Sequence, residues 1–330
     1  MVSRRRFLYS LGVLGAAGCV GVLPCLKQEE GGRLPERSVT KLRMGTFLTI
    51  AARHESLTLL DEALESAFQA AYAAESVLTR HAPGSPLGTL NAQGSLRDAP
   101  PLLVALLQGA LCLARQTRAG FNPATLPALE ALSSLGVPTV GALPRSVQRE
   151  LATLMDPQGI TVDGGTIRLK HSGMGVTLDG IAKGRIVDLV AASLERQGVT
   201  SYLVNGGGDI RVGSAAAGGK AWRIGIEDAG FPGKNVAGVS LRNRAMATSG
   251  NYESRSVKGY DHLVPGQEDC PTKCLAVTVL APTCAEADAL ATALFAMGVE
   301  RGTEYIRQRP ACACLWQTSD GIKASAGWRV

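Results

Sequence analysis

The spacing of apolar residues predicts strands and helices from about residue 40 onward. Residues 40–52 alternate between apolar and polar side chains, as a half-buried strand does. Apolar side chains then recur at helical spacing over residues 56–79, and again near residues 100–118. Residues 120–165 are rich in proline and leucine, which predicts short helices. A single strand is therefore expected to lead into a long helix at the start of the folded region.

The second half of the chain predicts a mainly β region with two helices. One helix is expected to run from about Gly184 to Gln197, and the other to cover residues 284–297. The predicted strands are residues 201–204, 222–227, 236–242 and 275–280, followed by a final pair of short strands. This order favours an α+β fold with mixed β-sheets and flanking helices, in a single domain that spans residues 40–330.

The first 26 residues have the pattern of a signal peptide. Arg4, Arg5 and Arg6 precede an apolar run that ends in small residues. The order Ser-Arg-Arg-Arg-Phe-Leu resembles a twin-arginine signal, which predicts export to the periplasm. A polar linker is expected over residues 27–39.

Two alternatives to simple cleavage stay open for this segment. The apolar run approaches the length of a membrane-spanning helix, although glycines and a proline interrupt it. Cys19 follows Ala-Ala-Gly, which resembles a lipoprotein cleavage site. Cleavage there would anchor the mature protein to the inner membrane through a lipid.

Composition and charge narrow the class of protein. Hydrophobic residues make up 45% of the chain and charged residues 19%, which is typical of a compact globular protein. The formal net charge is +6, and removal of the arginine-containing signal would leave about +3. With so small a charge, and no basic patch with interleaved aromatic residues, we exclude a nucleic-acid-binding protein.

Eight cysteines lie along the chain, four of them in two close pairs, Cys270-x3-Cys274 and Cys312-x-Cys314. Neither pair has the two-residue spacing of a zinc knuckle. Because disulfides persist in exported proteins, the sequence favours disulfides over a metal cluster.

Two features suit an anionic ligand. Gly206, Gly207 and Gly208 follow a predicted strand. A loop without Cβ atoms lets backbone N–H groups approach a phosphate, and the alternative interpretation is a simple tight turn. Asp209 comes next. Lys183 lies where a loop becomes a helix, a place that favours an anion, although most lysines are solvated.

Asp288 and Thr292 are four residues apart on a predicted helix and therefore share one face. A carboxylate and a hydroxyl so placed supply hard oxygen ligands for Mg²⁺, and the alternative is a polar stripe on an amphipathic helix. His262 lies in a predicted loop, where it is either a general base or a solvated histidine. Thr248 and Ser249 are expected to form a small polar turn with Gly250.

Together these features resemble the FAD:protein FMN transferase family, also called ApbE or flavin transferases. The motifs follow the family's order over about residues 40–300. They are Met44-Gly45-Thr46, Ser85-x-Leu87-x-x-Leu90-Asn91, Phe121-Asn122-Pro123, Gly180-Ile181-Ala182-Lys183-Gly184 with Val187-Asp188, Asn205-Gly206-Gly207-Gly208-Asp209-Ile210, Ala247-Thr248-Ser249-Gly250, His262, and Ala287-Asp288-Ala289-Leu290-Ala291-Thr292.

The resemblance implies a two-lobed fold with FAD in the cleft between the lobes. It implies Mg²⁺-dependent transfer of FMN from FAD to a Ser or Thr hydroxyl of a target protein, with release of AMP. The acceptor would be a flavoprotein subunit of a membrane redox complex. The implied metal ligands are Asp288, Thr292 and the carbonyl of Ala182, and the implied catalytic residues are His262 and Lys183. The implied FAD-binding residues are Met44, Asn91, Lys183, Gly206, Gly207, Gly208, Asp209, Thr248 and Ser249.

The chain departs from the family pattern after His262, where Leu263-Val264-Pro265 stands in place of Ile-x-Asp-Pro. Two other functions therefore stay open. One is a flavin-binding carrier without transferase chemistry, which this departure favours. The other is an FAD pyrophosphatase, in which water replaces the acceptor hydroxyl.

Overall fold

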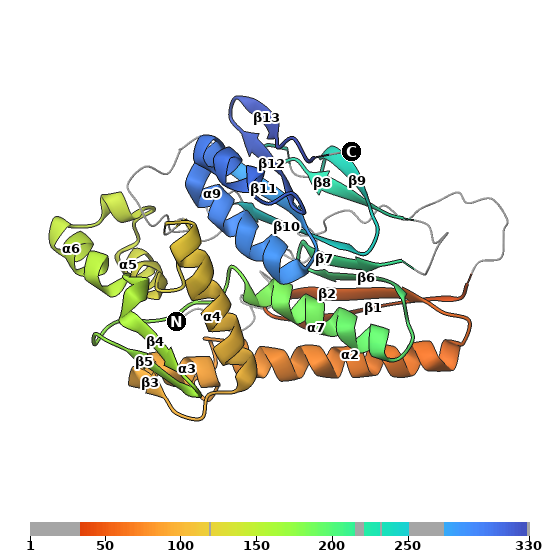
Figure 1. Cartoon of the computed structure of the whole chain (residues 1–330), viewed down its shortest axis with the longest axis horizontal. Helices are drawn as coiled ribbons and strands as arrows, with labels where there is room; N and C mark the ends of the chain where they lie inside the picture. Colours follow the sequence, from red (N-terminus) through yellow and green to blue (C-terminus); the bar gives the residue numbers. More distant parts are fainter. Residues whose placement is uncertain (1–33, 119, 215–220, 232, 251–273, 329–330) are drawn as a thin grey trace, which may run out of the picture.

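An eight-stranded sheet forms the frame of the computed structural model, which describes residues 34–328 apart from 119, 215–220, 232 and 251–273 (Figure 1). The strand order is β1-β2-β6-β7-β10-β11-β12-β13. The strands are β1 (Glu36–Arg43), β2 (Thr46–Arg53), β6 (Ser201–Gly206), β7 (Asp209–Gly213), β10 (Arg244–Gly250), β11 (Cys274–Ala281), β12 (Ala313–Thr318) and β13 (Gly321–Ala324). Every pairing in this sheet is antiparallel.

Helices cover one face of this sheet, and a two-stranded ribbon covers part of the other. The helices are α2 (Leu57–Leu78), α7 (Ala182–Arg196) and α9 (Cys284–Arg307). The ribbon is β8 (Trp222–Glu227) with β9 (Asn235–Leu241). Alternation along the strands explains both layers: Tyr202 and Val204 of β6 pack in the core under the helices, while Leu203 packs with the ribbon.

A smaller group of elements lies at one end of α2 and forms the second lobe (Figure 1). It contains the helices α3 (Pro86–Gln93), α4 (Pro101–Gln116), α5 (Leu126–Leu135) and α6 (Arg145–Leu154), and the sheet β3 (Ser95–Leu96), β5 (Thr166–Leu169), β4 (Ile160–Asp163). Two short 3₁₀ turns, Val140–Ala142 and Pro157–Gly159, join them. Side chains of α3 and α4 belong to the same core as α2 and α7, so the lobes share it.

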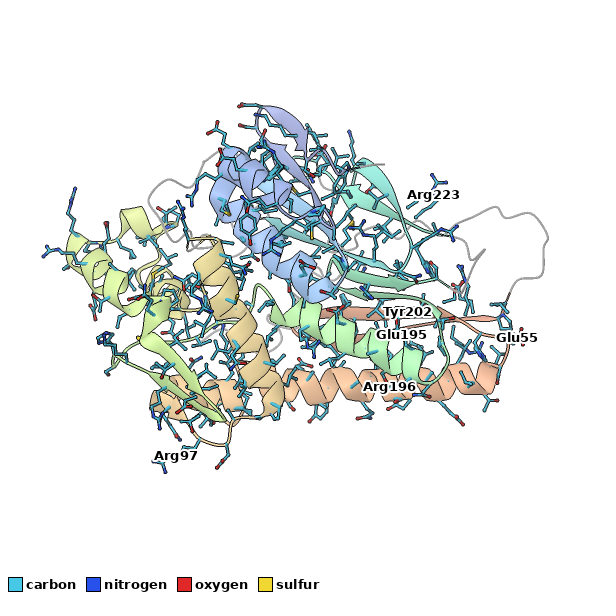
Figure 2. All side chains as sticks on the ribbon, in the orientation of Figure 1. Glu55, Arg97, Glu195, Arg196, Tyr202 and Arg223 are labelled. Atoms are coloured by element: carbon cyan, nitrogen blue, oxygen red, sulfur yellow. The ribbon has the colours of Figure 1, made fainter. Side chains whose placement is uncertain are left out.

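The α+β class is confirmed, with differences in detail. The predicted helices at 56–79 and 100–118 appear as α2 and α4. The sheets were expected to be mixed, but all described strand pairs are antiparallel. Short connections, which join antiparallel strands, link β1 to β2, β4 to β5, β6 to β7, β8 to β9 and β12 to β13. In the last turn of α7, Glu195 accepts a hydrogen bond from the hydroxyl of Tyr202 in β6 at 2.5 Å, and this bond joins the helix to the sheet (Figure 2).

Residues 40–52 were expected to form one strand, and that prediction is wrong. They belong to the hairpin of β1 and β2, whose two turn residues both have positive φ, +54° at Met44 and +70° at Gly45. That conformation matches the twist of a two-residue hairpin. Strand β1 also begins at Glu36, inside the segment expected to be a linker.

The predicted polar turn at Thr248, Ser249 and Gly250 is also wrong, because these residues end strand β10. Pairing with β11 supplies the backbone partners that the local sequence does not reveal. Helix α9 runs past the predicted end at residue 297 to Arg307, with a kink at Gly298, where φ is +73°. Among the described helices, none is both long enough and apolar enough to span a membrane.

A disulfide between Cys312 and Cys314 is not formed, since both carry free thiols, as do Cys112 and Cys284. The thiol of Cys274 donates to the carbonyl of Ala276 at 3.9 Å. Cys270 itself, like the whole signal segment, lies outside the described residues.

Candidate active site

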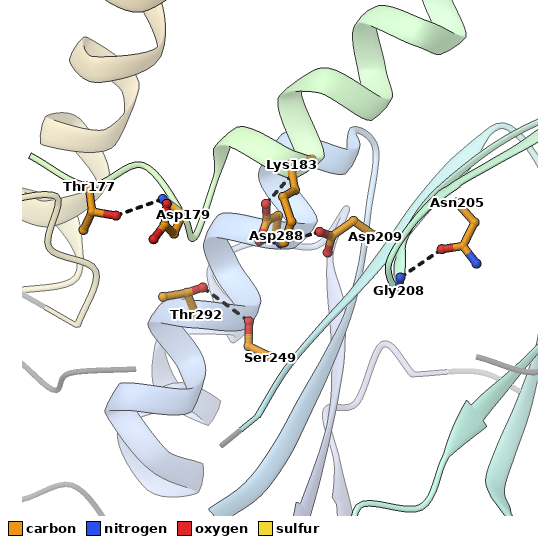
Figure 3. A network of polar contacts seen from close by, with 10 residues as sticks. Thr177, Asp179, Lys183, Asn205, Gly208, Asp209, Ser249, Asp288 and Thr292 are labelled. Atoms are coloured by element: carbon orange, nitrogen blue, oxygen red, sulfur yellow. Dashed lines mark hydrogen bonds and ion pairs between the residues drawn. The ribbon is translucent and has the colours of Figure 1, made fainter. Parts of the chain in front are cut away.

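The Lys183 ammonium group lies between two carboxylates that come from distant parts of the chain (Figure 3). Its Nζ is 2.5 Å from Oδ2 of Asp209 and 3.6 Å from Oδ1 of Asp288. Lys183 lies in the first turn of α7, Asp209 begins β7, and Asp288 lies in the second turn of α9. The structure thus brings together three of the residues predicted for the site.

Close packing of two helix starts makes this arrangement possible. A Cβ added to Gly184 would lie only 2.3 Å from the carbonyl oxygen of Cys284 and 2.8 Å from Cβ of Asp288. Only glycine lets the first turn of α7 approach α9 so closely. The backbone N–H of Gly184 donates to Oδ2 of Asp288 at 2.9 Å, which orients that carboxylate.

The site carries more negative than positive charge. Asp209 and Asp288 are each only 2% exposed, whereas the Lys183 side chain keeps 35% of its surface. Burial raises the pKa of Asp288 to about 7, and the charge of Asp209 adds to this effect. Burial also raises the pKa of Asp209, against the attraction of Lys183. Burial alone would lower the pKa of Lys183, but the two carboxylates raise it above its ordinary value. A cation would therefore be stabilised here.

Two hairpin turns, one between β6 and β7 and one between β1 and β2, meet beside this cluster. The turn from β6 to β7 is tight, with positive φ at Gly207 and Gly208. Gly207 packs against the side chain of Thr46, where an added Cβ would lie 2.5 Å from the hydroxyl oxygen. The N–H of Gly208 donates to Oδ1 of Asn205 at 2.9 Å. The glycines thus serve close packing of two hairpins, and at Gly208 the N–H expected for a phosphate already has an acceptor.

Met44 lies in the neighbouring hairpin turn. Its N–H donates to Oε1 of Glu75 on α2 at 2.7 Å, and its side chain packs near Gly206. Met44 and the turn after Gly206 are therefore neighbours, as expected for residues of one site. Glu75 gave no signal in the sequence, because its role depends on a turn 31 residues away.

Thr292 lies one turn beyond Asp288 on α9. Its Oγ1 is 3.3 Å from Oγ of Ser249 at the end of β10 (Figure 3). A Cβ added to Gly180 would lie 2.8 Å from the same Thr292 oxygen. Ser249 therefore belongs to the cluster. Thr248 points elsewhere, since its hydroxyl pairs with that of Thr278 at 2.9 Å.

Asn91 lies in α3, and its side chain contacts the segment that precedes Gly180. Its side-chain amide donates to the carbonyl of Val176 at 2.8 Å and accepts from the N–H of Val176 at 2.7 Å. Both polar atoms are thereby used to hold the strand-like segment that leads to Gly180. His262, the predicted base, lies outside the described residues.

Asp188 has a structural role that the sequence did not predict. Its two carboxylate oxygens accept from the N–H groups of Cys284 and Ala285 at 2.8 Å and 2.9 Å. Burial raises its pKa, against the two N–H donors, which lower it. Asp188 follows Gly184 by four residues and therefore lies on the same face of α7 one turn later, a signal that could have drawn attention to it.

The chemistry of the donor set fits a small divalent cation. Asp288 and Thr292 present hard oxygens on one helix face, and Ala182, whose carbonyl is the third expected ligand, begins the helix opposite. Among the described residues there is no cluster of three or more His, Cys, Asp and Glu side chains that could hold a metal. The expected ligand set of Asp288, Thr292 and the carbonyl of Ala182 contains one carboxylate and two uncharged oxygens.

A separate surface pocket of about 610 Å³ contains none of the predicted site residues. It lies between the end of α4 and the second half of α9, and is lined by Gln116, Thr117, Arg118, Met297, Arg301, Glu304, Tyr305, Gln308 and Arg309. Arg309 is already held by Glu286, Gln116 and Tyr305. The buried charge cluster, and not this pocket, therefore defines the candidate site.

Comparison with known proteins agrees with this geometry. The model of the ApbE family matches residues 44–316, a range that contains Lys183, Asp209, Asp288 and Thr292. The chain belongs to the ApbE family. It is 32% identical to an FAD:protein FMN transferase of Treponema pallidum (strain Nichols), over 93% of each chain. It is also 36% identical to an FAD:protein FMN transferase of Vibrio cholerae, over 51% of this chain and 52% of that protein.

Solved ApbE structures share the fold. The flavin transferase ApbE from Vibrio cholerae superposes with a TM-score of 0.73 at 25% identity, covering 89% of this chain and 98% of that one. The ApbE protein from Thermotoga maritima superposes with a TM-score of 0.77 at 21% identity, covering 88% and 97%. The two-lobed arrangement of this chain is therefore the ApbE fold.

Proposed function

We propose that this chain transfers FMN from FAD to a Ser or Thr hydroxyl of a target protein in a Mg²⁺-dependent reaction that releases AMP. The observation that carries the proposal is the buried charge cluster. Lys183 is held between Asp209 and Asp288, and Thr292 lies one turn away on the same helix. Membership of the ApbE family, and the flavin transferase activity that its relatives are named for, support the same reaction.

In this proposal the pyrophosphate of FAD lies beside Lys183, in the cleft between the lobes. Asp288, Thr292 and the carbonyl of Ala182 would hold Mg²⁺, which when bound stabilises negative charge on the pyrophosphate. The remaining steps are those of the protein's own groups. Lys183 is kept protonated by its two carboxylates and attracts the phosphates. Gly184 and Asp209 fix the positions of Asp288 and Lys183.

Transfer forms one bond and breaks one. The acceptor oxygen bonds to the phosphorus atom of the FMN half of FAD, and the bond from that phosphorus to the bridging oxygen breaks, so that AMP leaves with the bridging oxygen. The hydroxyl proton passes to a base, for which the family resemblance proposes His262. Met44, the turn after Gly206, and Ser249 would border the bound FAD, because they surround the cluster.

The proposed setting of this reaction is the periplasm. The signal over residues 1–26 supports export through the twin-arginine route, with lipid anchoring at Cys19 as a further proposal. The acceptor would be an exported flavoprotein subunit of a membrane redox complex.

The test is incubation of the purified protein with FAD, Mg²⁺ and an acceptor protein that carries a flavinylation Ser or Thr, followed by intact-mass analysis of the acceptor. We expect the mass of FMN to be added, and the addition to vanish with EDTA and in Asp288→Asn. Exposed Asp61→Asn is the matched control and should behave as wild type. Release of free FMN without acceptor modification would instead establish a pyrophosphatase, and tight binding of intact FAD would establish a carrier.

A further inference from the structure

Helices α7 and α9 pack against each other, and each has its first turn capped by a carboxylate of the other. Asp188 of α7 accepts from the N–H groups of Cys284 and Ala285, the first two residues of α9, at 2.8 Å and 2.9 Å. In return, Asp288 of α9 accepts from the N–H of Gly184 in the first turn of α7 at 2.9 Å. Three hydrogen bonds thus tie the two helix starts together in both directions.

Asp188 completes the set of acceptors that the start of α9 needs. The first four N–H groups of a helix have no partner inside the helix. In α9 the N–H of Glu286 donates to Oγ1 of Thr283 at 3.2 Å, and the N–H of Ala287 makes the first intrahelical bond, to the carbonyl of Thr283 at 3.1 Å. The N–H groups of Cys284 and Ala285 donate to Asp188, so one side chain from another helix supplies two of the three acceptors that residues 284–286 need.

This bond pattern fixes how α9 is placed. Successive residues of a helix are turned by about 100° around its axis, so two consecutive N–H groups held by two oxygens define both the depth and the rotation of the helix start. Asp288 and Thr292 follow Cys284 by one and two turns. A shift of α9 by a single residue would rotate both away from Lys183.

We propose that Asp188 is a positioning residue of the active site, which sets the start of α9 so that Asp288 and Thr292 face Lys183 and the start of α7. The part of this inference that concerns metal binding rests on the proposed function. The part that concerns the hydrogen bonds between the two helices is independent of it. Asp188 itself touches neither the ammonium group nor the proposed ligands in any hydrogen bond that the structure shows.

Two variants separate this role from ordinary helix capping. Asp188→Asn keeps the size of the side chain but replaces one acceptor oxygen with an N–H₂ donor, which faces a backbone N–H. Thr283→Ala is the matched control, because it removes a cap at the same helix end and leaves the tie to α7 intact. If Asp188→Asn does not fold, Asp188→Glu serves in its place, since it keeps the charge and displaces the oxygens.

The first readout is binding of Mn²⁺, added alone to the purified protein and followed by the loss of the free-ion signal in electron paramagnetic resonance. We expect the dissociation constant to rise at least about tenfold in Asp188→Asn, and less in Asp188→Glu, as for other residues that orient metal ligands. Thr283→Ala should keep the wild-type value although it unfolds more easily. Equal Mn²⁺ affinity in both variants would overturn the positioning role.

The second readout, backbone hydrogen exchange, needs no metal. Asp188→Asn should speed exchange at the starts of both helices, residues 182–188 and 284–292, because Asp288 moves away from Gly184. Thr283→Ala should speed it at the start of α9 only. If the wild-type protein binds no Mn²⁺, the metal part of the proposed function fails, but hydrogen exchange still tests the positioning role. Faster exchange at the start of α9 alone in Asp188→Asn, without a change in α7, would refute that role.

Discussion

Gly184 and Cys284 are in such close contact that a Cβ on Gly184 would lie 2.3 Å from the carbonyl oxygen of Cys284. The contact joins the first turn of α7 to the first residue of α9. Since Lys183 precedes Gly184 and Asp288 follows Cys284 by one turn, this contact sets the spacing of the charge cluster.

Gly184→Ala should destabilise the protein, although alanine is the better helix former by roughly 1 kcal/mol. The added methyl group would force the two helices apart at a cost of about 1–3 kcal/mol, as in other overpacked sites. Urea unfolding of the variant measures the change. Gly109→Ala in α4 is the matched control, because nothing lies within 4 Å of its added Cβ, and it should stabilise. A stabilised Gly184→Ala would contradict the close packing.

Asp288→Asn should make the metal-free protein more stable at neutral pH while it abolishes Mg²⁺-dependent turnover. The substitution leaves one carboxylate for one ammonium group, so the excess buried negative charge disappears. Thermal unfolding at pH 7.5 in EDTA, beside an activity assay, measures both effects. A variant with unchanged turnover would remove Asp288 from the metal role.

The pH dependence of wild-type stability provides a second check on Asp288. Its pKa is about 7 in the folded protein, above the ordinary value of 3.8, so the folded state holds this proton more tightly than the unfolded state. Its contribution to stability is therefore fully present below about pH 4 and is lost as the pH rises to about 7. The difference in thermal midpoint between Asp288→Asn and wild type should grow over that range. A constant difference would contradict the raised pKa.

Lys183→Met should cost more stability than the double variant Lys183→Met/Asp209→Asn. The single change leaves two nearly buried carboxylates without a counter-charge, whereas the double change removes one of them. The expected loss for the single variant is about 2 kcal/mol or more, less than for a fully buried pair because Lys183 is partly exposed. Urea unfolding of the two variants and of Asp209→Asn completes the cycle. Additive losses would show that the pair is not coupled.

Cys314 should resist alkylation in the folded protein. Its side chain is fully buried, and burial raises the pKa of its thiol to about 12, so little thiolate forms at pH 8. Iodoacetamide treatment followed by peptide mass spectrometry should modify the partly exposed Cys112 first and Cys314 only after unfolding. Equal rates at the two thiols in the folded protein would contradict the burial of Cys314.

The elements with long, regular patterns could be predicted from the sequence, and short or paired ones could not. Helix α2 was predicted at residues 56–79 and lies at Leu57–Leu78, because one face carries an uninterrupted apolar stripe. The hairpin turn at Met44 was not predicted because the alternation of apolar and polar residues continues from β1 into β2. Strand β10 was missed because Thr248 and Ser249 have no strand pattern of their own, and the neighbouring strands supply their partners.

The site divides in the same way. Asp288 and Thr292 could be paired from their spacing on one helix, and the motifs around Lys183 and Asp209 indicated the family. Asn91 was expected among the FAD-binding residues from the resemblance alone, and its pairing with Val176, 85 residues away, could not be predicted from the sequence. Asp188 and Glu75 could not be assigned at all, because each acts on a backbone N–H that only folding brings near.

The α+β class, the long helices and the residue types of the charge cluster follow from periodicity and motif spacing, which are local properties of the chain. The position of Lys183 between Asp209 and Asp288, and the mutual capping of the two helix starts, follow from folding. An ammonium group and the free N–H groups of a helix start bind the acceptors that packing brings near, and these lie far away in the sequence. Asp209, the partner of the Lys183 ammonium group, is 26 residues away from it in the sequence. Asp188, which accepts from the N–H of Cys284, is 96 residues away from that residue.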